Sequence, residues 1–236
     1  MAYTKLELLG RKIIFTIFKP IIWLILKLNI SPNILTIIGL LINIGATVIF
    51  IYGAEFGQRE ELVYVSWAGL TILLGGVFDM LDGLIAKEHG KMTKFGALFD
   101  SVIDRYSELF MFFGIAYFLV SHDYFVSSVL TFLALIGSVM VSYTRARAEG
   151  LNISCSVGIM QRPLRIVLIG FSAVISGLVS VNFGDTITIA VPKMFTVTFE
   201  AVSIFIIPII LVAIFANFTA IQRMHHAYKE LRDIEN

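Results

Sequence analysis

Long apolar runs alternate with short polar breaks along this sequence. After residue 31, apolar residues fill six runs, at roughly 33–53, 63–86, 94–120, 125–147, 162–182 and 197–222. A helix needs about 20 such residues to cross the hydrocarbon core of a bilayer. Glycine, histidine, asparagine or proline marks each break, for example at Gly57, at His89-Gly90 and between Asn182 and Pro192. The pattern predicts six transmembrane helices.

The first 31 residues follow a different pattern, in which basic residues keep interrupting the apolar positions: Lys5, Arg11, Lys12, Lys19 and Lys27. No small-residue cleavage site follows, so the segment is not typical of a signal peptide. Such a pattern favours a helix that lies in the membrane interface. We therefore expect one all-α integral membrane domain over 1–236, with an interfacial amphipathic helix at 1–31, a six-helix bundle at 32–225 and a cytoplasmic tail at 226–236.

Composition supports a membrane location. The 236 residues are 58% hydrophobic, against about 45–50% in soluble domains. In lipid every backbone polar group needs an internal partner, and long apolar runs without strand alternation provide one as helices. The single cysteine, Cys155, excludes an intramolecular disulfide. The net charge of +1 is uninformative as a total, and we expect no nucleic-acid partner.

Lysine and arginine are distributed unevenly among the connections. One set of connections carries only Arg59 and Lys193. The opposite set adds to the basic N-terminal segment Lys87, Lys91, Lys94, Arg145, Arg147, Arg162, Arg165, Arg223, Lys229 and Arg232. Because cytoplasmic connections are enriched in these residues, both termini and the second and fourth connections are expected on the cytoplasmic side of the cell membrane.

Four aspartates lie at that basic side. Asp79 and Asp82 are three residues apart at the end of the second run, and Asp100 and Asp104 are four apart at the start of the third. These spacings place side chains on one face of a helix. Two helices joined by a short turn can then direct four carboxylates into one space, and such oxygen ligands suit Mg²⁺, Mn²⁺ or Ca²⁺ better than zinc. Acidic residues within membrane segments usually mark a functional site.

A plainer interpretation is that the aspartates cap helices or pair with nearby cations such as Arg105. Gly83 and Gly96 argue against it, because glycine inside a helix is unfavourable unless a group must approach the backbone closely. A nucleotide or a neighbouring helix would supply that group. For Gly75-Gly76 we favour helix packing.

The same stretch resembles the signature of the CDP-alcohol phosphatidyltransferase family, D-x-x-D-G-x-x-A-R, eight residues, then G-x-x-x-D-x-x-x-D. Seven positions match at the right spacing: Asp79, Asp82, Gly83, Ala86, Gly96, Asp100 and Asp104. Lys87 stands where the pattern has arginine; it keeps the charge but lacks the planar fork that grips phosphate.

The resemblance implies transfer of a phosphatidyl-type group from a CDP-linked lipid to an alcohol, with release of CMP. It implies two Mg²⁺ ions, with Mn²⁺ as an alternative, held by the four aspartates, and Asp104 as the general base. The nucleotide would contact Asp79, Gly83, Ala86 and Lys87. SPNILT adds Asn33 and Thr36, for which a helix start with Pro32 in its first turn is an equal alternative. A homodimer is expected from the resemblance alone.

Arginines at the start or end of three other runs bear on the acceptor alcohol. SYTRARAEG carries Arg145, QRPLR carries Arg162, and IQRMHH carries Arg223. Together they could bind a dianionic phosphate through charge-assisted hydrogen bonds, although each alone is also typical of a cytoplasmic membrane anchor. The wording resembles the bacterial phosphatidylinositol-phosphate synthases and their archaeal counterparts, which implies inositol phosphate as a soluble acceptor. Glycerol phosphate is the alternative.

Two other classes of protein compete with an enzyme. A cation channel or transporter needs acidic residues spread across the membrane depth, whereas here they cluster near one face and the far half of the bundle offers only Glu200, in its last span. A structural scaffold needs neither a fixed spacer nor grouped arginines. Both fit the sequence less well than a transferase.

Overall fold

The computed structural model describes residues 20, 22–23, 25–28, 30–88, 92–191 and 195–235. Six long helices dominate this part of the chain. They are α2 (Pro32–Phe56), α3 (Val63–Glu88), α4 (Lys94–Ser121), α5 (Phe125–Glu149), α6 (Arg162–Phe183) and α7 (Ser203–Glu235). Each lies on one of the six apolar runs, so the predicted helical architecture is confirmed for the described residues.

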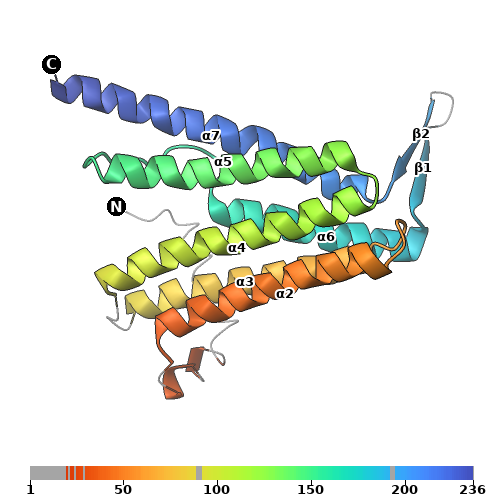
Figure 1. Ribbon diagram of the computed structural model, residues 1–236, viewed down its shortest axis with the longest axis horizontal. Helices are drawn as coiled ribbons and strands as arrows, with labels where there is room; N and C mark the ends of the chain where they lie inside the picture. Colours follow the sequence, from red (N-terminus) through yellow and green to blue (C-terminus); the bar gives the residue numbers. More distant parts are fainter. Residues whose placement is uncertain are drawn as a thin grey trace.

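The helices run side by side (Figure 1), and the contacts between neighbouring helices close into a ring. Helix α2 packs between α3 and α4, α3 packs on α6, and α7 joins α6 to α5, which returns to α4. The interior is filled by apolar side chains from every helix, among them Phe50, Ile72, Phe118, Ile169 and Phe205. Helices α4 and α6 therefore face each other across the ring, and side chains that meet between them lie inside the protein.

Small residues allow several of these helices to approach closely. A Cβ atom at Gly69 of α3 would lie 2.7 Å from the backbone oxygen of Gly170 of α6. A Cβ atom at Gly137 of α5 would lie 2.8 Å from the backbone nitrogen of Asn217 of α7. In lipid, where burial of apolar surface does not drive helix association, close packing at small residues is a main source of stability.

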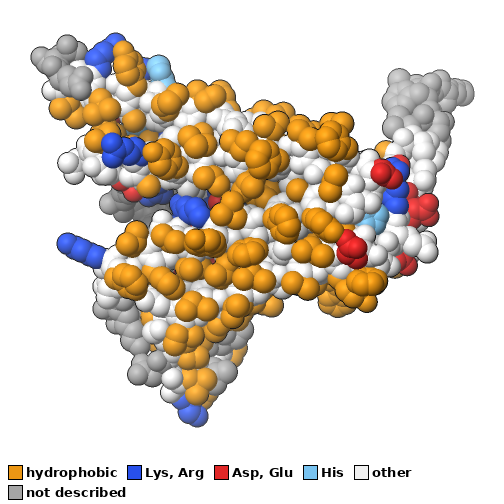
Figure 2. All heavy atoms as spheres, viewed as in Figure 1, with side chains coloured by type: hydrophobic (Ala, Val, Ile, Leu, Met, Phe, Trp, Pro, Cys, Tyr) orange, Lys and Arg blue, Asp and Glu red, His pale blue; other side chains and the backbone are white. Residues whose placement is uncertain are grey.

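The outer surface is apolar along the flank of the bundle (Figure 2). Large side chains such as Leu41, Trp67, Phe132, Phe171 and Ile214 are exposed, on a scale that soluble monomers avoid. Within the part of the chain that the structure describes, five helices are long and apolar enough to cross a membrane: α2, α3, α5, α6 and α7. The protein is thus a multi-pass membrane protein.

A β-hairpin between α6 and α7 was not expected. Strands β1 (Thr186–Val191) and β2 (Phe195–Glu200) pair antiparallel, with Thr186 opposite Glu200, and project from one end of the bundle (Figure 1). The predicted start of the last span at residue 197 is therefore wrong, because α7 begins only at Ser203. The alternation in TITIAV and FTVTFE has the period of a strand, which the apolar content of the segment concealed.

The base of the hairpin is held by a polar cluster at the end of the bundle opposite the aspartates. The Tyr124 hydroxyl donates to Glu200 Oε2 at 2.6 Å, and Arg59 Nε donates to the Tyr124 hydroxyl at 3.1 Å. Burial and then the bond to Glu200 raise the pKa of Tyr124 to about 12, so the hydroxyl stays protonated at neutral pH.

The predicted interfacial helix at 1–31 falls mostly outside the described residues. Within it, residues 25–27 are helical. Ile22 and Ile25 are buried in a small apolar cluster with Leu35, Leu81 and Ile85, so this segment packs on the end of the bundle formed by α2 and α3. Helix α7 runs to Glu235 and includes the expected tail.

Candidate functional site

The four aspartates of the sequence motif come together where α3 ends and α4 begins. Asp79 and Asp82 lie in the last turns of α3, and Asp100 and Asp104 in the first turns of α4. Thr93 caps α4, because its hydroxyl accepts a hydrogen bond from the Gly96 backbone N–H at 2.9 Å. The cap fixes the point at which α4 starts, and hence the height of Asp100 and Asp104 beside α3.

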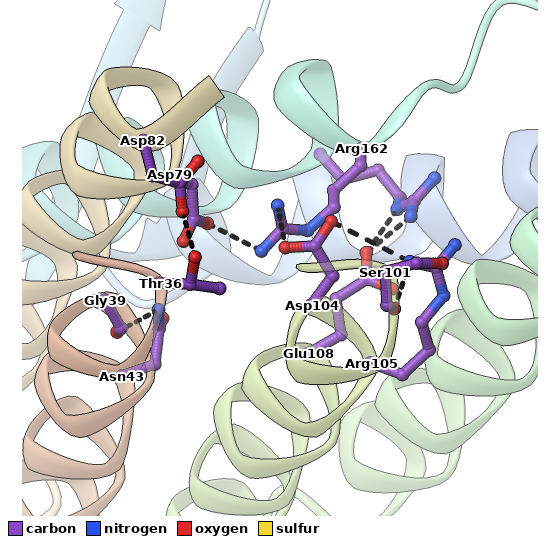
Figure 3. A network of polar contacts seen from close by, with 11 residues as sticks. Thr36, Gly39, Asn43, Asp79, Asp82, Ser101, Asp104, Arg105, Glu108 and Arg162 are labelled. Carbon is purple, nitrogen blue, oxygen red and sulfur yellow. Dashed lines mark hydrogen bonds and ion pairs between the residues drawn. The ribbon is translucent and has the colours of Figure 1, made fainter. Parts of the chain in front are cut away.

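Arg162, the first residue of α6, lies between two of these carboxylates (Figure 3). Its Nη2 donates to Asp79 Oδ2 at 2.6 Å, and its Nη1 is 2.7 Å from Asp104 Oδ1. All three side chains are largely buried. One guanidinium thus joins α3, α4 and α6 and offsets part of the negative charge that the aspartates bring into the bundle.

Helix α2 supports the other side of the cluster. The Thr36 hydroxyl donates to Asp82 Oδ2 at 2.6 Å, and Asp82 is buried. A Cβ atom at Gly39 would lie 2.7 Å from Asp79 Oδ1, so glycine is needed for α2 to approach that carboxylate. Asn43, one turn on, packs against Gly75, where an added Cβ would lie 2.6 Å from its side-chain nitrogen. The packing interpretation of Gly75 is confirmed.

A cavity of ≈ 150 Å³ opens beside the cluster. Asp82 and Asp100 line it, together with residues from the start of α2, the end of α3 and the start of α4: Pro32, Asn33, Thr36, Gly83, Ala86, Met92, Thr93, Gly96 and Ala97. A Cβ atom added at Gly83 would meet nothing within 4 Å. Glycine at this position therefore keeps the cavity open and does not serve close helix packing. Pro32 begins α2 as expected, yet Asn33 and Thr36 also face the cavity.

The four aspartates offer only carboxylate oxygens as metal ligands, which is the chemistry that Mg²⁺ and Mn²⁺ prefer. Among the described residues no three acidic, histidine or cysteine side chains already converge on one metal position, because Asp79 and Asp104 contact Arg162. The donor set therefore fits divalent cations on the condition that the Arg162 side chain releases these two carboxylates.

The three arginines predicted for the acceptor phosphate have different surroundings. Arg162 contacts the aspartates, as described. Arg145 is 52% exposed in its side chain and pairs with Glu149 at 2.8 Å on the same helix. Arg223 is only 3% exposed, and it donates to the backbone oxygens of Val157 at 2.8 Å and Val141 at 2.6 Å. Direct convergence of all three guanidinium groups is thus not observed.

Two other arginines lie close enough to Arg223 for their charges to act on it, namely Arg145 and Arg165, so Arg223 and Arg145 belong to one basic region. Through its hydrogen bonds to Val157 and Val141, Arg223 of α7 is tied to α5 and to the segment before α6, so it holds these parts of the chain together.

Sequence reasoning missed a buried ion pair one turn deeper. Arg165 of α6 is fully buried and pairs with Glu108 of α4, which is 2% exposed. The signal was present, because Glu108 continues the four-residue spacing of Asp100 and Asp104. By sequence Arg165 counts only among the basic residues of the cytoplasmic connections, whereas its side chain lies inside the ring.

Comparison with known proteins agrees with the arrangement. The model of the CDP-alcohol phosphatidyltransferase family matches residues 29–215. The archaetidylinositol phosphate synthase of Pyrococcus horikoshii is 37% identical over 207 residues, which cover 87% of this chain and 87% of that protein. The phosphatidylinositol phosphate synthase of Corynebacterium glutamicum is 31% identical over 166 residues, covering 69% and 71% of the two chains.

A solved structure shares the fold. The crystal structure of Mycobacterium tuberculosis phosphatidylinositol phosphate synthase with CDP-DAG bound has a TM-score of 0.68 at 24% identity, covering 90% of this chain and 94% of that one. The same enzyme in complex with manganese and citrate also gives a TM-score of 0.68. Together with the extent of the family match, these similarities show that the chain belongs to the CDP-alcohol phosphatidyltransferase family.

Proposed function

We propose that this protein transfers a phosphatidyl-type group from a CDP-linked lipid, such as CDP-diacylglycerol, to a phosphorylated polyol and releases CMP. The observation that carries the proposal is the position of the motif aspartates. Asp82 and Asp100 line one cavity at the basic end of the bundle, and Asp79 and Asp104 lie beside it with Arg162. The names of the related synthases support inositol phosphate as the acceptor.

The four motif aspartates, Asp79, Asp82, Asp100 and Asp104, would hold two divalent cations, and Mg²⁺ or Mn²⁺ would serve. The manganese complex of the related mycobacterial enzyme supports this choice. Bound cations supply charge neutralisation on the pyrophosphate and on the leaving CMP. Thr36 keeps one oxygen of Asp82 engaged by its hydrogen bond of 2.6 Å, so the carboxylate is oriented before any substrate binds.

The cavity would receive the nucleotide. Asn33 and Thr36 line it from α2, and Gly83 and Ala86 from α3; their small or polar side chains leave room for a flat base and offer hydrogen bonds. Lys87, the next residue along α3, would meet the phosphates as a point charge. The CDP-DAG complex of the related enzyme supports a CDP-linked lipid as donor.

The acceptor hydroxyl oxygen would attack the phosphorus that carries the lipid. A new phosphorus–oxygen bond forms, the bond to the CMP oxygen breaks, and Asp104 takes the hydroxyl proton. The acceptor's own phosphate would lie toward Arg162 and the basic region of Arg145 and Arg223. A dianion there is attracted by several guanidinium groups at once.

The same proposal includes orientation and assembly. We propose that the aspartate end of the bundle faces the cytoplasmic side of the cell membrane, because the basic connections gather at that end. We count α4 as the sixth span: at 28 residues it is about 42 Å long at the usual rise, and Asp104 and Glu108 pair with arginines of α6. The amphipathic helix at 1–31 would lie in the interface, and the enzyme would act as a homodimer.

CMP release by purified protein tests the proposal. With CDP-diacylglycerol, Mg²⁺ and inositol phosphate, we expect release that disappears when the acceptor or the metal is left out. Asp100→Asn removes one charge from the cavity and should abolish release. Asp123→Asn is the matched control, because Asp123 has a φ of +65° in the turn at the opposite end, a conformation that asparagine tolerates. Unchanged turnover in Asp100→Asn would refute the metal site.

A further inference from the structure

Two ion pairs cross the centre of the ring between α4 and α6. Arg162 meets Asp104, and Arg165 meets Glu108. Asp104 and Glu108 are four residues apart on α4, and Arg162 and Arg165 are three apart on α6, so each helix presents its two charges on one face. The deeper pair therefore lies one helical turn beneath the pair at the candidate site.

In the deeper pair, both hydrogen bonds from Arg165 to Glu108 go to the same carboxylate oxygen. Arg165 Nε donates to Glu108 Oε1 at 3.1 Å, Arg165 Nη2 donates to the same oxygen, and Nη1 donates to the Met160 backbone oxygen at 2.7 Å. A guanidinium fork usually gives one donor to each carboxylate oxygen. Here Glu108 Oε2 is left buried with no hydrogen-bond partner, which is unfavourable for a charged group.

A buried hydrogen-bond donor in the same part of the protein also lacks a partner. Arg162 Nε also has no hydrogen-bond partner, although the two terminal nitrogens of the same guanidinium contact aspartates. Glu108 is close enough for its charge to act on Arg162. Buried polar atoms without partners are rare in folded proteins. Asp104 Oδ1 and Ser107 Oγ of α4 are also buried without a hydrogen-bond partner. Spare acceptors and a spare donor in the same part of the interior indicate that the present contacts of Arg162 are one of two arrangements.

We infer that Glu108 is a positioning residue for Arg162, and that its free Oε2 holds the Arg162 guanidinium once Asp79 and Asp104 bind metal. The inference rests on the proposed function, in which those two carboxylates turn to divalent cations. Arg162 then loses both of its partners and would otherwise be an unpaired buried cation. Anchored from below by Glu108, the guanidinium keeps its outer nitrogens directed at the acceptor phosphate.

A simpler role for Glu108 is to neutralise Arg165 and nothing more. The two roles differ when both charges are removed. Replacement of a whole buried ion pair by uncharged residues of similar size is often neutral or stabilising, whereas removal of one partner is strongly destabilising. If Glu108 only neutralises Arg165, the double variant Glu108→Gln/Arg165→Met should restore full function. If Glu108 anchors Arg162, the double variant should fold well and still bind the acceptor poorly.

The test measures inositol phosphate binding by calorimetry, with Mn²⁺ and CMP present so that no turnover occurs, together with KM for both substrates and melting temperature. For the double variant we expect a near-normal melting temperature, CDP-lipid KM and Mn²⁺ affinity. Its acceptor affinity should fall roughly tenfold or more, the loss of one charge-assisted hydrogen bond. Arg165→Met alone should be less stable and yet keep its acceptor affinity within about twofold, because the carboxylate is still there.

Normal acceptor binding in the double variant would overturn the inference and leave the proposed function standing. A larger loss of acceptor affinity in Arg165→Met than in the double variant would also overturn it. If the wild-type protein itself binds no phosphorylated acceptor, the proposed function fails and the inference fails with it.

Discussion

Gly83 offers a direct test of the nucleotide cavity, because the effect of an added methyl group on binding can be separated from its effect on folding. Gly83 lies inside α3 and lines the cavity, and a Cβ atom added there would meet nothing within 4 Å. Gly83→Ala should therefore stabilise the helix by about 0.5–1 kcal/mol. For a chain of this size, that gain raises the melting temperature by roughly 2–4 °C per kcal/mol.

The same methyl group should weaken donor binding. It enters a cavity of ≈ 150 Å³ that the nucleotide is expected to fill. Overpacking a well-fitted site costs about 1–3 kcal/mol, which corresponds to a roughly 5- to 150-fold higher KM for the CDP-linked lipid. The KM for inositol phosphate should change little, because the acceptor binds on the Arg162 side.

Gly45→Ala is the matched control. Gly45 lies inside α2, also with nothing within 4 Å of an added Cβ atom, and it does not line the cavity. Gly45→Ala should raise the melting temperature by the same amount and leave both KM values unchanged, as measured by CMP release in detergent. If the KM for the CDP-linked lipid is unchanged in Gly83→Ala, or rises equally in Gly83→Ala and Gly45→Ala, the assignment of the cavity to the nucleotide is refuted.

Three further predictions concern the site and the far end of the bundle. Arg162→Ala leaves two buried carboxylates without their cation, so we expect the free energy of unfolding without metal to fall by about 3–5 kcal/mol. Adding Mn²⁺ should then raise the melting temperature more than in wild type. Equal rises would contradict the proposal that metal replaces arginine at these carboxylates. Lys87→Arg restores the family pattern and should leave CMP release intact or improved, whereas an inactive variant would give Lys87 a role of its own. Tyr124→Phe removes the bond of 2.6 Å to Glu200 and should lower stability by about 1.5–3 kcal/mol with activity unchanged, and lost activity would tie the hairpin to catalysis.

Local patterns were sufficient to predict most of the helices and the grouping of the aspartates. Spans of about 20 apolar residues define membrane helices, and the spacings of Asp79 with Asp82 and of Asp100 with Asp104 depend only on helix geometry. The short connection between their helices then brings the two pairs together. Each step uses information that lies within some 25 neighbouring residues of the sequence.

The partners of Arg162 and Arg165 depend on how distant helices pack, so spacing within one helix could not reveal them, whereas Glu149 lies four residues from Arg145 on the same helix. Arg145 and Arg162 both lie at helix ends on the basic side, yet one pairs with Glu149 at the surface and the other with Asp79 and Asp104 inside. The burial of Glu108 with Arg165 follows from α4 facing α6 across the ring. The hairpin was missed for a different reason, because six-residue strands rich in Ile, Val and Phe resemble the beginning of an apolar helix.

The acceptor preference tests the central claim most directly. CMP release by the purified protein should be measured with CDP-diacylglycerol and Mg²⁺ against inositol phosphate, glycerol phosphate, free inositol and serine at equal concentrations. We expect release with inositol phosphate, less with glycerol phosphate, and none above background with the two acceptors that lack phosphate. Equal release with free inositol and inositol phosphate would contradict the proposed function, because Arg162 and the basic region of Arg145 and Arg223 would then have no role in binding an acceptor phosphate.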